Sequence, residues 1–158
     1  MKLIKAGILK RFNYFKKLIK ADMPVHNLSL SIALGIFIGL AVPVGFQTFL
    51  IIPAALLLRC NVTVAWAASY ISNPVTIFPI YIVAAFIGER LTSFKVSLVK
   101  INYFISHPSA NSLLGVGPNT VIAVLAGSLI MGIILSIAVY YFSFFLITRQ
   151  REKSKQSA

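Results

Sequence analysis

Residues 27–58 read NLSLSIALGIFIGLAVPVGFQTFLIIPAALLL and contain no charged side chain. Two further stretches, residues 62–88 and 119–148, are also uncharged. Each is longer than the roughly 20 residues that a helix needs to cross the hydrocarbon core of a bilayer. The pattern predicts an all-α fold, a polytopic α-helical membrane protein.

The composition of the 158 residues agrees with that prediction. Hydrophobic residues make up 58% of the chain, charged residues only 11%, and the mean hydropathy is +0.88. A soluble domain is about 25% charged, so too little polar surface is available here for a soluble enzyme or binding domain. Cys60 is the one cysteine in the sequence, which excludes an internal disulfide framework and a cysteine-rich metal site.

The net charge of +12 is concentrated at the two ends of the sequence. Seven of the 15 basic residues lie in the first 20 positions and four in the last ten. Basic clusters that flank apolar segments follow the positive-inside rule for membrane proteins, and no basic face carries base-stacking aromatic residues. We therefore expect no nucleic acid partner.

Residues 1–21 have the pattern of a basic amphipathic helix that lies at the membrane interface. Apolar residues from Ile4 to Ile19 recur at spacings of three and four, and lysines occupy the other side. Such a helix would bind the lipid bilayer on its anionic leaflet. The alternative is that this arm only orients the first span. The lysines are Lys2, Lys5, Lys10, Lys16, Lys17 and Lys20.

Prolines interrupt two of the apolar stretches. Pro43 precedes Val44-Gly45, and Pro74 follows Asn73. Because proline lacks a backbone N–H, each break divides its stretch into two helical pieces of about 17–23 Å at 1.5 Å per residue. These Pro-broken pieces, 28–42, 46–58, 62–72 and 75–88, are short for a crossing. The alternative is that the prolines only kink long, tilted helices.

The basic ends favour a topology in which both termini are cytoplasmic. Three simple crossings would place the termini on opposite sides, so one Pro-broken stretch should be re-entrant and residues 28–88 should make an odd number of net crossings. We predict a multi-pass protein of the bacterial inner (cytoplasmic) membrane. It would comprise an interfacial helix (1–21), a single membrane domain (22–148) and a basic cytoplasmic tail (149–158).

The breaks supply the candidate functional residues. Asn73-Pro74 is a helix-start signal, with Asn73 as N-cap and Pro74 at the first helical position. Paired broken segments in a membrane protein also indicate a substrate path. The candidates for a pathway or for the breaks themselves are Pro43, Gly45, Gln47, Asn61, Asn73, Pro74 and Thr76.

Three further segments complete the chain. The apolar spacing in residues 89–106 predicts a second interfacial helix, and the Ser/Asn/Gly/Pro composition of residues 109–119 predicts a loop. In the last stretch, small residues at helical spacing predict close helix packing. They are Gly127, Ser128, Gly132 and Ser136.

The stretch from Met23 to Leu91 resembles an uncharacterised bacterial integral membrane family, the domain of unknown function 2062. IALGIFIGLAVPVGFQT, LLLRCNVTVAW and YISNPVTIFPIYI, together with Gly88, carry the resemblance. It implies a small multi-spanning membrane domain with no assigned catalytic residues.

We therefore expect a non-enzymatic structural or accessory membrane component, with no cofactor, no metal and no catalytic residue. The three apolar stretches lack acidic residues, which argues against ion-coupled transport. A membrane-protein partner or a homo-oligomer would fit this role. The alternative is a passive solute permeation or lipid-handling pathway formed by the segments around Pro43 and Pro74.

Overall fold

The structure is a computed structural model that describes residues 23–43, 46–73, 75–107 and 109–156. All regular secondary structure in these residues is α-helical, so the all-α prediction is confirmed for them. The predicted interfacial helix, residues 1–21, lies outside the described residues. The helices are α2 (Val25–Ala41), α3 (Gln47–Leu57), α4 (Val62–Ser69), α5 (Ile77–Thr92), α6 (Leu98–Ser106), α7 (Ala110–Val116) and α8 (Pro118–Gln156).

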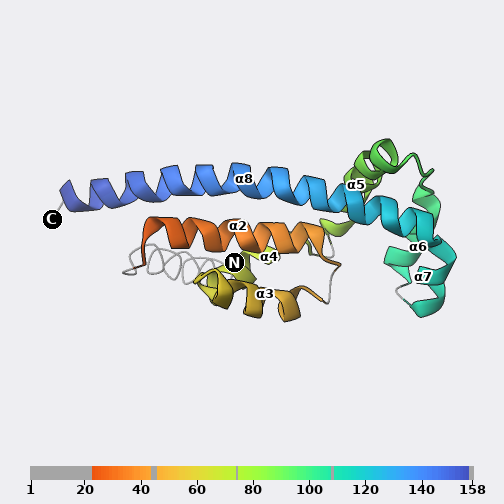
Figure 1. Cartoon of the computed structure of the whole chain (residues 1–158), viewed down its shortest axis with the longest axis horizontal. Coiled ribbons are helices and arrows are strands. Elements are labelled where there is room, and N and C mark those ends of the chain that lie inside the picture. The colour runs from red at the N-terminus through yellow and green to blue at the C-terminus, as the bar shows by residue number, and fades with distance from the viewer. Residues whose placement is uncertain (1–22, 44–45, 74, 108, 157–158) are drawn as a thin grey trace, which may run out of the picture.

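Helix α8 is the axis of the molecule, and α2 and α5 pack along it (Figure 1). Its 39 residues include most of the segment predicted as a tail, because the helix continues to Gln156. Helix α2 lies antiparallel to the C-terminal half of α8, with Leu28 beside Ile147 and Phe37 beside Gly132. Helix α5 packs near the N-terminus of α8.

Helices α2 and α3 form a hairpin that begins and ends near the same end of α8 (Figure 1). The turn after α3 lies beside the start of α2, because the Asn27 side-chain amide donates a 3.2 Å hydrogen bond to the Arg59 carbonyl. Helix α4 then runs parallel to α2. The Asn61 N–H donates to the Ser31 hydroxyl, and further along Gly39 faces the Ser69 backbone.

Helix α5 continues in the direction set by α4, toward the opposite end of α8. Its residues Ala84 and Gly88 meet Gly127 and Ala123 of α8 in antiparallel order. Helix α4 therefore lies against α2 and α3, and α5 packs against α8, with an interruption between Ser69 and Ile77.

Small residues allow these helices to approach closely. A Cβ atom added at Gly88 would lie 1.8 Å from the Ala123 carbonyl oxygen, and one at Gly127 would lie 1.9 Å from the Ala84 carbonyl oxygen. Both helices thus present small residues four positions apart, the pattern that permits close packing between membrane helices. The packing role predicted for Gly127 is confirmed, and Gly132 packs against α2.

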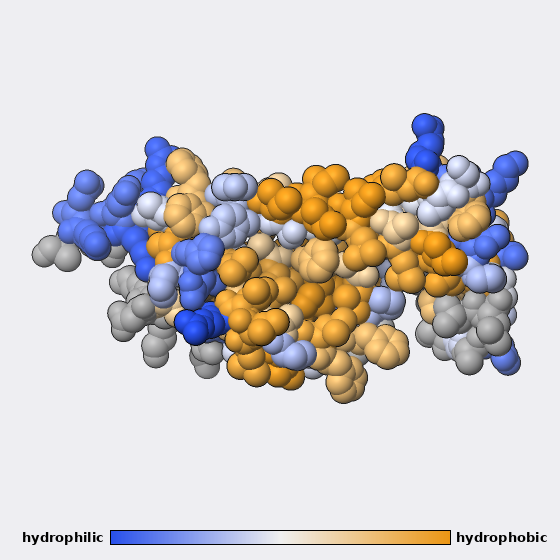
Figure 2. Space-filling view, in the orientation of Figure 1, coloured by the Kyte–Doolittle hydropathy of each residue, from blue (hydrophilic) through white to orange (hydrophobic). Residues whose placement is uncertain are grey.

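The face of the molecule shown in Figure 2 is broadly apolar in the middle, with polar groups at both ends of the long axis. Among the described residues, one helical segment, Pro118–Lys153, is long and apolar enough to cross a membrane, and only 28% of its most apolar window is buried. The apolar helices Val25–Ala41 and Gln47–Leu57 are shorter. A water-soluble core helix would hide its apolar residues, whereas α8 exposes most of them.

Two local predictions were wrong. The helix predicted for residues 89–106 is two helices, because Ser93 adopts a left-handed conformation (φ 58°) that ends α5, and α6 begins only at Leu98. The loop predicted for residues 109–119 contains α7. Its start is capped by Ser109, whose hydroxyl accepts a 3.1 Å hydrogen bond from the Ser112 N–H.

Candidate functional site: the paired helix breaks

The first break ends α2 and is closed by the side chain of Gln47. A proline at position 43 has no N–H, so the Gly39 carbonyl lacks its helical donor. The Gln47 side-chain nitrogen supplies it at 3.1 Å and also lies 3.2 Å from the Val42 carbonyl. Gln47 therefore replaces hydrogen bonds that α2 loses where it ends.

The second break contacts the first through Ser72. The Gln47 side-chain nitrogen lies 3.0 Å from the Ser72 hydroxyl oxygen, and that hydroxyl donates to the Gly39 carbonyl. Ser72 is 6% exposed, so this contact is largely shielded from the surroundings. Two side chains that are 25 residues apart in the sequence thus join the two breaks in one hydrogen-bonded junction.

The second break is organised locally by Asn73 and Thr76. The Asn73 side-chain oxygen accepts from the N–H groups of Val75 (2.9 Å) and Thr76 (3.2 Å), and the Asn73 carbonyl accepts from the N–H of Ile77 (2.9 Å). These bonds are of the kind that an N-cap side chain makes, but the residue directly before the regular helix is Thr76, and Asn73 stands three residues earlier. The regular helix begins at Ile77 instead of Val75.

Both breaks combine a proline with a side-chain amide that donates to a backbone carbonyl. Pro74, like Pro43, has no N–H, and the Tyr70 carbonyl four residues before it accepts a 3.4 Å hydrogen bond from the Asn73 side-chain amide. At each break a side-chain amide therefore donates to a backbone carbonyl close to the end of the preceding helix, and at the first break this is the carbonyl that the proline leaves without its helical donor. Gly45 and Pro74 themselves lie outside the described residues; Pro43 is described and exposed.

Asn61, the remaining candidate, is not at the breaks. It caps α4, where its side-chain oxygen accepts a 3.1 Å hydrogen bond from the Val64 N–H. Its own N–H donates to the Ser31 hydroxyl at 2.8 Å, which ties the start of α4 to α2. The structure therefore brings Gln47, Asn73 and Thr76 to one region and places Asn61 at the turn between α3 and α4.

The turn between α3 and α4 also contains Arg59 and Cys60. Arg59 has a positive φ of 53°, the left-handed conformation that ends α3. Cys60 is buried, and this burial raises the pKa of its thiol, while a hydrogen bond with the Ser31 side chain acts in the opposite direction. A raised pKa keeps the thiol protonated at neutral pH and makes it a poor nucleophile.

The sequence marks Ser72 as a polar side chain near the second break that could satisfy freed backbone groups, but Ser72 was not among the candidate site residues. Its importance depends on the parallel alignment of α2 with α4, which brings it to Gly39. The signal in the sequence is the matched spacing of small residues, Gly35 and Gly39 in α2 with Ala65 and Ser69 in α4. Both pairs are four residues apart and are offset by 30 positions.

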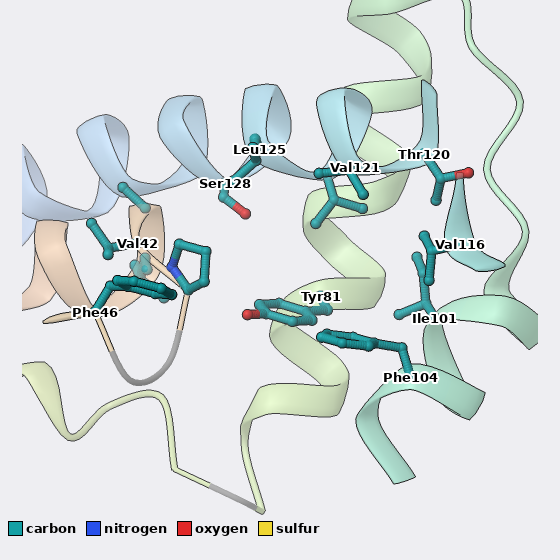
Figure 3. A pocket seen from close by; sticks show the side chains of 14 residues that line it. Val42, Phe46, Tyr81, Ile101, Phe104, Val116, Thr120, Val121, Leu125 and Ser128 are labelled. Carbon is teal, nitrogen blue, oxygen red and sulfur yellow. The ribbon is translucent and has the colours of Figure 1, made fainter. Parts of the chain in front are cut away.

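An apolar pocket of about 280 Å³ lies beside the first break. Val42 and Phe46 border it on one side, and Ile101 and Phe104 of α6 border it on the other (Figure 3). Ser128 of α8 directs its hydroxyl toward the space. The lining is otherwise mainly apolar, so it suits a hydrocarbon group better than water or an ion.

No curated protein and no solved structure matches the chain. A family described as "uncharacterized protein conserved in bacteria (DUF2062)" matches residues 10–156. This confirms the resemblance seen around Pro43 and Asn73 and extends it over nearly the whole sequence. The chain belongs to this bacterial family.

Proposed function

We propose that this protein is a non-enzymatic, multi-pass structural or accessory component of the bacterial cytoplasmic membrane. The observation that carries the proposal is the contact between the breaks. The polar side chains that could have bound a substrate, Gln47 and Ser72, are used to close the ends of helices. Inside a bilayer, irregular backbone is tolerated where protein satisfies its polar groups, which is what these side chains do.

The proposed topology follows from the directions of the helices. The α2–α3 hairpin would enter the membrane and return to the same side, α4 and α5 would make one interrupted crossing, and α8 would make the second. Two crossings place both termini on one side. The segment from Ser93 to Gly117, which includes α6 and α7, would then lie on the opposite side.

The distribution of charge supports one orientation of this proposed topology. Arg59 and the basic residues at the C-terminal end of α8 lie at one end of the molecule, and the seven N-terminal basic residues precede α2 in the sequence. The other end carries Arg90, Lys95 and Lys100 beside Glu89. By the positive-inside rule, the first end would be the cytoplasmic one.

Reporter fusions test the topology directly. We expect a fluorescent reporter at residue 158 to be active and alkaline phosphatase at the same position to be inactive. Alkaline phosphatase inserted at Asn111, in α7, should be active. Signals on the same side at Asn111 and residue 158 would contradict two crossings.

The accessory role predicts a stable association in the membrane. We expect cross-linking of tagged protein in intact cells to capture one membrane-protein partner, or a second copy that co-purifies with a differently tagged chain. A monomer that captures neither would contradict this role.

A second candidate function is lipid handling, and the apolar pocket beside Phe46 favours it over the permeation of polar solutes. Purified protein in liposomes tests both kinds of pathway through lipid scrambling and solute flux. Scrambling that Gln47→Ala abolishes while folding persists would support the lipid-handling candidate. Flux of a polar solute would instead support a permeation pathway.

A further inference from the structure

We propose that the apolar pocket between the first break and α6 binds one acyl chain of a membrane phospholipid. This inference rests on the proposed membrane insertion. The pocket lies where the molecule is hollowed below α8, between the α2–α3 hairpin and the α6–α7 segment (Figure 2). In a bilayer, the hydrocarbon around the protein is the medium that would fill such a space.

The walls of the pocket are chemically suited to hydrocarbon. The floor is formed by well-buried residues, among them Ile101 (4% exposed) and Val116 (6% exposed). At the rim, Phe46 and Leu125 are exposed and continue into the apolar surface. A chain could therefore enter sideways from the bilayer across this apolar rim. The walls that it would cover are mainly apolar, and the polar side chains among them are Tyr81, Thr120 and Ser128.

Charge identifies the end of the lipid that would lie outside the pocket. Helix α6 contributes Ile101 and Phe104 to the pocket, while the adjacent Lys100 lines a second, open groove together with Tyr103 and Asn111. These residues lie toward the end of the molecule where α8 begins. A phospholipid with its acyl chain in the pocket would direct its phosphate to this end, where the lysine ammonium complements its negative charge.

Photo-cross-linking with a phospholipid that carries a diazirine on one acyl chain tests this inference. The protein is reconstituted into phosphatidylethanolamine–phosphatidylglycerol vesicles, irradiated and mapped by mass spectrometry. We expect labels concentrated on the pocket segments, residues 98–104 and 116–125, above the level on the exposed face of α8 around Ile133 and Ile137. Uniform labelling along α8 would overturn the pocket while still reporting insertion.

Matched leucines on α8 provide the variant test. Leu125 lines the pocket and is 37% exposed, whereas Leu129, one turn later, is 46% exposed and outside it. Leu125→Trp should reduce labelling of residues 98–104 by about tenfold, equivalent to about 1.4 kcal/mol, and Leu129→Trp should leave it unchanged. Equal labelling in the two variants would overturn the proposal.

A second pair of variants tests the pocket even if Leu125→Trp fails to fold. Val121 lines the pocket and is partly buried, and its neighbour Ile122 is 50% exposed. Val121→Trp should block labelling and Ile122→Trp should not.

Failure of membrane insertion is a separate outcome, because it would abolish labelling on the exposed face of α8 as well and would overturn the proposed topology with the pocket. Lys100→Gln should weaken labelling in the pocket, and no change would overturn the phosphate assignment.

Discussion

The side-chain nitrogen of Gln47 lies 3.0 Å from the hydroxyl oxygen of Ser72, and this contact joins the two helix breaks into one structure. Both groups also bind the Gly39 carbonyl, which a proline at position 43 deprives of its helical donor. The breaks are therefore not two independent defects. The end of α2 uses the hydroxyl of Ser72 from the second break, and Ser72 in turn contacts Gln47 from the first.

Replacing Gln47 with leucine should destabilise the protein. The substitution leaves the carbonyls of Gly39 and Val42 without the Gln47 amide in a partly buried site, which costs about 1–3 kcal/mol. The measurement is the free energy of unfolding in mixed detergent micelles. Thr48→Val, at the exposed neighbouring position, is the control and should change it little.

The coupling between the breaks can be measured separately. A double-mutant cycle of Gln47→Leu and Ser72→Ala should give an interaction energy of about 0.5–3 kcal/mol, because the two side chains are in direct contact. Additive effects would show that the breaks are energetically independent and would refute the junction.

Local chemistry made the breaks themselves predictable. The prolines at 43 and 74 marked where helices end, and Asn73 was predicted as a cap because an asparagine before a proline is a helix-start signal. The partner of Gln47 could not be found in this way. It depends on the parallel alignment of α2 with α4, and an almost uniformly apolar helix has no polar side to indicate which of its faces packs.

The errors near the N-terminus of α8 have a similar origin. The apolar residues keep a helical spacing across Ser93, so the sequence pattern predicted one helix for residues 89–106. The left-handed conformation of Ser93 divides this stretch into two helices. The composition of residues 109–119 indicated a loop, but the hydroxyl of Ser109 caps a short helix there. In both cases serines at single positions mark the local change of backbone, Ser93 at the first and Ser109 with Ser112 at the second, and the average composition of a window does not show it.

The contact between α5 and α8 should tolerate no added side chain. A Cβ atom at Gly88 would lie 1.8 Å from a backbone carbonyl oxygen, which can be relieved only by separating the helices. Gly88→Ala should therefore destabilise the protein by about 1–3 kcal/mol, the usual cost of overpacking a close contact. Unfolding in mixed micelles measures this cost.

Gly115 provides the matched control for Gly88. A Cβ atom there meets nothing within 4 Å, and the residue lies in α7. Gly115→Ala should leave stability unchanged or raise it by about 0.4–1 kcal/mol through the lower entropy of the unfolded chain. Equal effects of the two substitutions would mean that α5 and α8 are not as close as the structure places them.

The contribution of the α4 N-cap to stability should be independent of the contact between Gln47 and Ser72. Asn61→Ala removes the acceptor for the Val64 N–H and should cost about 1 kcal/mol of stability, whereas Asn61→Ser retains an oxygen and should recover most of it. Neither substitution should alter the coupling energy between Gln47 and Ser72, because Asn61 lies at the other end of α4. A loss of that coupling in Asn61→Ala would show that the cap, too, positions the breaks.

The Cys60 thiol should need a higher pH to react with maleimide in the folded protein than in the unfolded chain. Burial disfavours the charged thiolate and raises the pKa, so a smaller fraction of thiolate is present at any given pH near neutrality than in the unfolded chain. The midpoint of the rate–pH profile should therefore lie above that of protein unfolded in sodium dodecyl sulfate. Limited access would lower the rate without moving the midpoint, which distinguishes it from the effect of pKa.

Because the hydrogen bond with Ser31 lowers the pKa, Ser31→Ala should move the midpoint further upward, and a shift downward would contradict this account of the turn.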